Sequence, residues 1–104
     1  MLIEFKMAFQ FENLRVWQRS LDLTLTTHKL TKTFPSEEKF NLSSQIQRAT
    51  DSINLNIAEG STGQTKKEFS RFLSIALRSA IEVVACLQIG KSFQIMILIL
   101  FIMN

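Results

Sequence analysis

The apolar residues of this chain recur every three or four positions over three long stretches, and little in the sequence interrupts them. That spacing places side chains on one face of an α-helix, whereas a half-buried strand needs strict alternation. Only three Gly and one Pro occur among 104 residues, so the turn chemistry of a many-stranded sheet is missing. The sequence predicts an all-α fold, an antiparallel (up-down) helical bundle in a single domain over residues 1–104.

The first stretch covers residues 14–32 and is predicted to be one helix. Pro35 ends it, because a proline disfavours helical geometry at the residue before it. The apolar face of this helix is predicted to contain Leu14, Trp17, Leu21, Leu25 and His28, widened by Leu23 and Leu30.

The second helix is predicted over residues 37–59, with Ser36 as its N-cap and Gly60 as a left-handed residue at its end. Its apolar face is predicted to contain Leu42, Ile46, Ala49, Ile53 and Ile57. A polar line runs beside that face: Gln45, Arg48, Ser52, Asn56 and Glu59. These side chains either form a hydrogen-bond network between helices or face water. We favour the network, because Ser and Asn are poor choices for an exposed helix interior.

A third helix is predicted to begin at Lys66, where Thr65 and Glu68 form a capping box. Its apolar face is predicted to contain Phe69, Phe72, Leu73, Ala76, Ala80, Val84 and Leu87. The pattern breaks after Gln88, where Gly90 interrupts it. The sequence thus predicts a three-helix unit over residues 9–88 and an atypical apolar tail over residues 89–104.

The tail is predicted to form a short fourth helix that docks imperfectly into the groove left by the other three. Residues 93–103 contain Gln94 as their only polar residue, but they are fewer than the roughly 20 that cross a bilayer. Lys91 would lie mid-segment in a longer span, so we expect no membrane partner. A helix apolar on every side exposes one face when it docks, so we expect poor solubility. The side chains expected to fill the groove are Phe93, Ile95, Ile97, Leu98, Phe101 and Ile102.

Little in the sequence supports catalysis. His28 and Cys86 are the only residues of their kind, and neither has partners at the spacing of a metal site or an activated nucleophile. The glycines before Lys66 lack the spacing of a phosphate-binding loop. We therefore predict no enzyme activity, catalytic residue, cofactor, metal site or small-molecule substrate. A single cysteine excludes an intrachain disulfide and favours a reducing, cytoplasmic location.

A line of basic residues on the third helix is the best-defined candidate site. Its members follow each other at steps of four, three and four, which places them opposite the apolar face. Such a line can contact a phosphate backbone, face water, or pair with acidic residues of a partner helix. The line consists of Lys67, Arg71, Ser74 and Arg78, and a second basic pair on the first helix consists of Arg15 and Arg19.

Several segments match a known pattern in the right order. FENLRVWQ (11–18), Phe34-Pro35, LSSQIQRA (42–49), SINLNIAEG (52–60) and EFSRFLSIALRSAIE (68–82) resemble the four-helix-bundle proteins encoded in intervening sequences of bacterial 23S ribosomal RNA genes. The resemblance extends over about residues 9–87. The polar, charged fourth helix of that family is replaced here by the apolar tail, which we interpret as a truncated or altered C-terminus.

The resemblance implies an antiparallel four-helix bundle and a homo-oligomer. Related proteins, including accessory proteins of diversity-generating retroelements, assemble as barrel-shaped pentamers with basic surfaces, so a pentamer is the expected assembly. No enzyme activity is established for the family, and its biological role is largely unknown. We expect a non-enzymatic oligomer that binds RNA, DNA or a nucleic-acid-processing partner through basic surface residues. The alternative is a structural protein-interaction module without nucleic-acid binding.

Overall fold

The computed structural model describes residues 10–34, 39–63 and 65–103, without the side chains of residues 10, 39, 40 and 93–97. Every regular element in these ranges is helical, which confirms the predicted all-α class. The expected N-cap Ser36 lies outside the described residues. The elements are the 3-10 helix η1 (Gln10–Asn13), α1 (Arg15–Thr31), the π-helical turn η2 (Lys39–Ser43), α3 (Ser44–Ser61) and α4 (Lys66–Met103).

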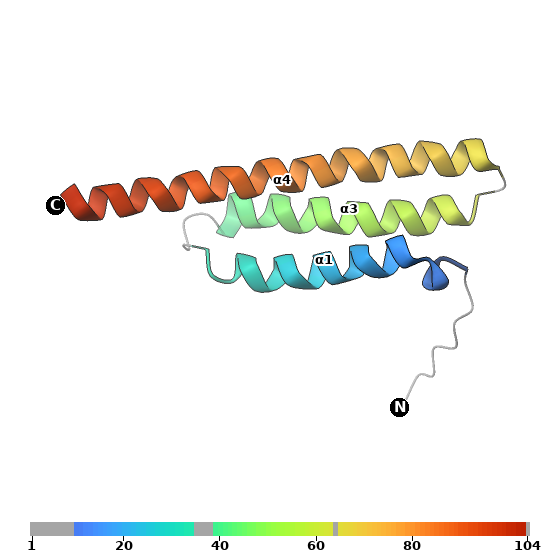
Figure 1. Cartoon of the computed structure of the whole chain (residues 1–104), viewed down its shortest axis with the longest axis horizontal. Helices are drawn as coiled ribbons and strands as arrows, with labels where there is room; N and C mark the ends of the chain where they lie inside the picture. The colour runs from blue at the N-terminus through green and yellow to red at the C-terminus, as the bar shows by residue number, and fades with distance from the viewer. Residues whose placement is uncertain (1–9, 35–38, 64, 104) are drawn as a thin grey trace, which may run out of the picture.

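The helix α3 lies between α1 and α4, and each helix runs opposite to the one before it (Figure 1). The main contacts of the fold are those of α3 with α4 and of α3 with α1. The two outer helices are therefore held together chiefly through α3.

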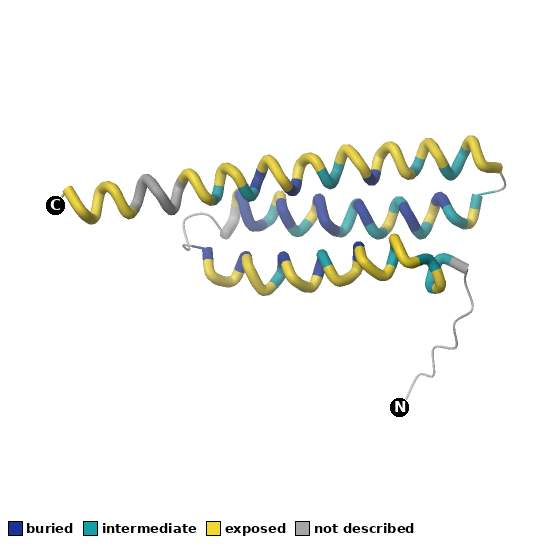
Figure 2. The backbone as a smooth tube through the Cα atoms, in the orientation of Figure 1, coloured by how far each residue is buried: buried dark blue, intermediate teal, exposed yellow. Residues whose placement is uncertain are grey.

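The core follows the apolar face predicted for the second helix. The five predicted side chains on that face are all buried, and Figure 2 shows the buried positions concentrated on α3. From α4, Ala76 and Val83 pack into the same cluster, and Cys86 packs with Phe34 at the far end of α3. Burying each large aliphatic side chain stabilises the fold by about 1.5–3 kcal/mol, so the three buried isoleucines Ile46, Ile53 and Ile57 contribute strongly to its stability.

The apolar face predicted for the first helix is confirmed only in part, because Leu14, Trp17 and Leu23 pack against the core cluster. Leu21 and Leu25 are 39% and 56% exposed, whereas the buried residues of α1 are Ser20, Thr24, Thr27 and Thr31. Burial of a hydroxyl is costly unless it is hydrogen-bonded. Here each hydroxyl bonds a carbonyl one turn back, as Thr27 Oγ1 does to Thr24 O at 2.9 Å. A count of apolar residues alone therefore misses the polar part of the packed face of this helix.

The predicted role of Gly60 is also wrong. Within the described residues no glycine has a positive φ, and α3 continues through Gly60 to Ser61. A Cβ on Gly60 would lie 2.5 Å from Phe72 Cβ and 3.0 Å from Phe69 Cδ1. The glycine is thus needed because α3 and α4 approach closely at this point, and not because the chain turns there.

The predicted break at Gly90 and the separate fourth helix are wrong as well. One helix of 38 residues, α4, runs without interruption from Lys66 to Met103. A Cβ on Gly90 would lie 3.3 Å from Leu42 Cδ2 and 3.4 Å from Phe34 Cζ, so this glycine packs against the end of the core. A single glycine costs only about 1 kcal/mol inside a helix, too little to break it. The C-terminal part of α4 therefore extends past α1 and α3 (Figure 1).

Part of α4 also has the composition of a membrane-spanning helix. Within the described residues the stretch Lys66–Ser92 is long and apolar enough to cross a membrane, with a mean hydropathy of 1.7 in a window that is 17% buried. This is weak evidence, because a core helix of a soluble protein passes the same test. The absence of a membrane partner stays a prediction.

Candidate functional site

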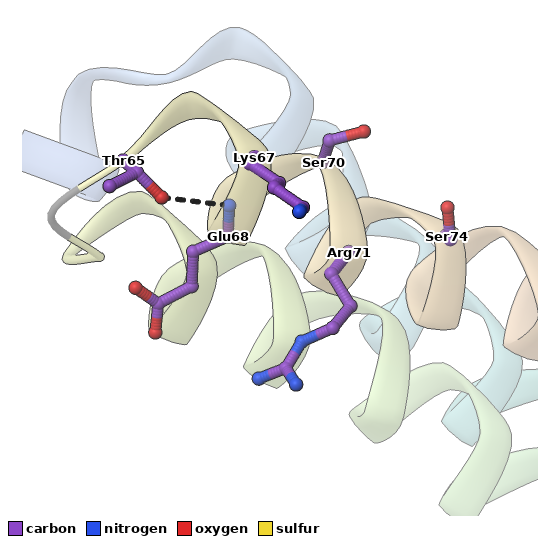
Figure 3. A pocket seen from close by; sticks show the side chains of 6 residues that line it. All are labelled: Thr65, Lys67, Glu68, Ser70, Arg71 and Ser74. Carbon is purple, nitrogen blue, oxygen red and sulfur yellow. Dashed lines mark hydrogen bonds between the residues drawn. The ribbon is translucent and has the colours of Figure 1, made fainter.

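The predicted line of basic residues lies on the outer face of α4, and we call Lys67, Arg71, Ser74 and Arg78 the basic ridge. All four side chains are exposed. The first three border a shallow, open hollow of about 450 Å³, together with Thr65, Glu68 and Ser70 (Figure 3). Arg78 continues the same face one turn further along the helix.

Two local features position the ridge. The N–H of Glu68 donates a hydrogen bond to Thr65 Oγ1 at 3.1 Å, which caps the start of α4 and forms the Thr65 half of the predicted capping box (Figure 3). Further along, Ala76 and Val83 bury one face of α4 against α3. At 100° per residue the ridge lies on the opposite side of the helix, so its cations point to solvent.

The cations of the ridge carry uncompensated charge. Among the described residues, Lys67, Arg71 and Arg78 form no ion pair with a carboxylate. Arg71 Cζ lies 5.4 Å from the ring centroid of Phe72, a cation–π contact that leaves the guanidinium N–H groups free to donate. A neighbouring phosphate or carboxylate from another molecule would therefore find these donors available.

The second basic pair does not join the ridge. Arg15 and Arg19 are exposed at the start of α1. Because α3 lies between α1 and α4, the two basic groups belong to helices that do not adjoin (Figure 1). The structure therefore offers two separate basic patches, of which the ridge on α4 is the longer.

Part of the predicted polar line connects α3 with α4. Asn56 Nδ2 donates to Ser52 Oγ at 3.0 Å, and Ser79 Oγ from α4 donates to Ser52 Oγ at 2.8 Å. About two turns further along α4, the Cys86 thiol lies 3.7 Å from Gln45 Oε1. These contacts cross the helix interface at two places and set the register of the two helices.

The other two members of that line, Arg48 and Glu59, are not brought to the interface. Both side chains are exposed, and neither forms a side-chain hydrogen bond with a described residue. The helical twist explains the division, because Arg48 and Glu59 lie further round α3 than Ser52 and Asn56.

A second polar interface, between α1 and α3, was missed by the sequence interpretation. Asn54 Nδ2 donates to Thr24 Oγ1 at 2.7 Å, and Gln47 Nε2 donates to Thr31 Oγ1 at 3.0 Å. Thr50 is fully buried within hydrogen-bond reach of Thr24 and Thr27. The spacing of hydroxyl residues at 20, 24, 27 and 31 is the signal that could have revealed it.

The two residues with reactive side chains have structural surroundings. Cys86 is buried, and burial followed by the charge of Glu82 raises the pKa of its thiol. A raised pKa keeps the thiol protonated at neutral pH, so it is a poor nucleophile. His28 is half-buried, and the described residues contain no group of His, Cys, Asp and Glu that could hold a metal ion.

Fold and site together define a small all-helical protein with a basic outer helix face. The family model for the 23S rRNA-intervening sequence protein matches residues 12–97, and the chain belongs to this family. The match includes α1, α3 and most of α4, and it leaves the last residues of the apolar tail outside. No curated protein matches the sequence significantly.

Proposed function

We propose that this chain is a non-enzymatic, self-associating cytoplasmic protein that binds nucleic acid through the basic ridge. The observation that carries the proposal is that Lys67, Arg71 and Arg78 stand in one exposed line without ion pairs among the described residues. From Lys67 to Arg78 the helix rises about 17 Å, which corresponds to about five nucleotide steps of 3.4 Å along a duplex strand. The line is therefore long enough to contact several consecutive phosphates.

The expected recognition depends on charge and not on sequence. Lys and Arg contacts to phosphates fix the position of a protein on a strand but read no base. The ridge contains no aromatic side chain on which a base could stack. Binding should thus be similar for RNA and DNA strands of equal length and should weaken strongly with salt.

The test compares the salt dependence of binding in two charge-matched variants. In K67Q/R71Q/R78Q the ridge is neutralised, whereas K29Q/K32Q/R48Q removes three other exposed cations. Anisotropy of a labelled single-stranded RNA gives log K against log salt. The slope of the ridge variant should fall by about two, because each lost phosphate contact removes about 0.7. The control should keep most of its slope. No binding of either RNA or DNA at low salt contradicts the proposal.

The alternative, a structural interaction module, is favoured by the exposed apolar side chains. Leu25 on α1 and Leu77 and Ile81 on α4 are more than half exposed, and such positions commonly pack against another protein. This function predicts self-association with no nucleic-acid binding at any salt concentration. Light scattering across a dilution series measures the mass, with a pentamer as the expected assembly. A strictly monomeric, well-folded protein contradicts self-association.

A further inference from the structure

The outer helices border an apolar position beside the core that no described element fills. On α4, Leu73, Leu77 and Val84 are exposed, and they share a helix face with Ala80 and Leu87, which pack against the core cluster. On α1, Val16 and Leu30 are exposed and lie seven residues either side of Leu23, which packs against the same cluster. We call the exposed residues Val16, Leu30, Leu73, Leu77 and Val84 the open seam.

The chain also contains an apolar helix end, the last turns of α4, against which no other described element packs. Beyond the N-terminal end of α3, the last turns of α4 run into solvent (Figure 1). Their described side chains are exposed, from 49% at Ile99 to 80% at Phe101 (Figure 2). Within the described residues, one molecule thus exposes two apolar surfaces: the open seam, on which no helix packs, and the last turns of α4, which pack on no other element.

The tail cannot reach the seam of its own chain in this conformation. It continues α4 in a straight line, away from α1 and α3. Folding back would require breaking α4 near Gly90, where the helix packs against Phe34 and Leu42. Complementary elements that cannot meet within one chain meet between two identical chains, as in domain swapping.

We propose that residues 93–103 of one copy occupy the open seam of a second copy, and that the second copy returns the same contact. This inference rests on the proposed self-association and names the segment that produces it. The tail enters antiparallel to the partner's α4, which is the direction a fourth helix takes in an up-down bundle. A two-fold arrangement of this kind closes as a dimer and leaves neither tail free, so this contact predicts a dimer where the family resemblance implies a pentamer.

The dimensions of the two elements agree. Residues 93–103 rise about 16 Å, and the seam from Leu73 to Val84 rises about 17 Å. Burial of each large apolar side chain removes roughly 60–120 Å² from water. Two tails in two seams therefore bury on the order of 1,000 Å², close to the lower bound of a stable specific interface. Lipid would cover the tail but would leave the seam of every chain exposed.

Cross-linking between single-cysteine chains tests the inference in the full-length protein. All chains carry C86A, so that the buried native thiol is absent. A chain with L98C on the tail is mixed with a mass-tagged chain with L77C in the seam, and a short bismaleimide is added. The matched control is I75C, which is also exposed but lies on the opposite flank of α4. We expect L98C to link to L77C more than about tenfold faster than to I75C, since docking raises the local concentration to millimolar.

Three results would overturn the inference. Equal linking of L98C to L77C and I75C would show non-specific adhesion of the tail. A link within one chain of the double variant L77C/L98C would show that α4 folds back on itself. A monomer that floats with phosphatidylcholine vesicles and forms no L77C link would make lipid the occupant. If light scattering still shows an oligomer after any of these, the self-association of the proposed function stands without this contact.

Discussion

The two ends of α4 have the same backbone conformation and opposite surroundings. In the first part, Ala76, Val83 and Cys86 are buried against α3 while the basic ridge faces water. In the last part, from Leu98 to Met103, every described side chain is apolar and exposed. A helix therefore continues where its backbone bonds can continue, whereas packing depends on having one apolar and one polar face. The first part is the proposed binding site, and the last part is the surface for which we propose a second copy as partner.

The largest difference between the packed part of the bundle and the end of α4 is expected in the free energy of unfolding after truncation of one side chain. Ile53 is buried between α3 and α4, so Ile53→Ala should lower the free energy of unfolding by about 2–5 kcal/mol. We call the part of α4 from Leu98 to Met103 the overhang. Leu100→Ala removes one exposed side chain of the overhang and should change the free energy of unfolding by less than about 0.5 kcal/mol in the monomer. Urea unfolding followed by circular dichroism at low protein concentration measures both. Equal losses would show that the overhang packs within its own chain.

Alanine substitutions at the two helical glycines, Gly60 and Gly90, should have different effects on stability. Gly60→Ala places a methyl group 2.5 Å from Phe72 Cβ and should cost about 1–3 kcal/mol of stability. Gly90→Ala meets only the ends of Leu42 and Phe34 at 3.3 Å and 3.4 Å, and it gains up to about 1 kcal/mol of helix propensity. We expect it to be close to neutral. Thermal melting compares the variants, and a larger loss at Gly90 would contradict the described close approach at Gly60.

Thiol reactivity should separate buried and exposed positions. Burial raises the pKa of Cys86, so its thiolate fraction at neutral pH is small. The native thiol should react with iodoacetamide more than about tenfold slower than L100C in a C86A chain. The folded state favours the protonated thiol, so stability from this group is present below its ordinary pKa and falls as pH rises past it. Rapid alkylation of Cys86 in the folded protein would show that it is accessible.

Neutralising the ridge should have the smallest effect on stability. Lys67, Arg71 and Arg78 are exposed and form no ion pairs with described residues, so K67Q/R71Q/R78Q should change the free energy of unfolding by less than about 0.5 kcal/mol. The same urea titration measures it. A loss of several kcal/mol would mean that the ridge is part of the fold and not a binding surface.

The sequence predicts the features that depend on simple helical periodicity. The buried face of α3 and the exposed basic ridge of α4 follow directly from residues three and four apart, such as Ile53 and Ile57 or Lys67 and Arg71. The start of α4 follows from the Thr65 cap, which holds the N–H of Glu68. Each of these depends on local sequence alone.

Features that depend on tertiary contact are not predicted from the sequence. The face of α1 that packs is set by hydrogen bonds from Asn54 and Gln47 on α3 to threonines, and apolar periodicity does not report them. Gly60 and Gly90 serve close approach between helices, which local turn rules interpret as helix ends. The polar line divides because α4 covers Ser52 but does not reach Arg48.

We infer that the basic ridge and the overhang of α4 act separately. Sedimentation velocity of the protein with and without labelled single-stranded RNA, at stepped salt concentrations, tests it most directly. K67Q/R71Q/R78Q should assemble as the unmodified chain does but lose about two units of salt slope. L98E/F101E should assemble more than about tenfold more weakly, since charged residues replace apolar contacts, and should keep the slope per chain. If each variant instead changes both assembly and RNA binding, the two parts of α4 form one site and the account is contradicted.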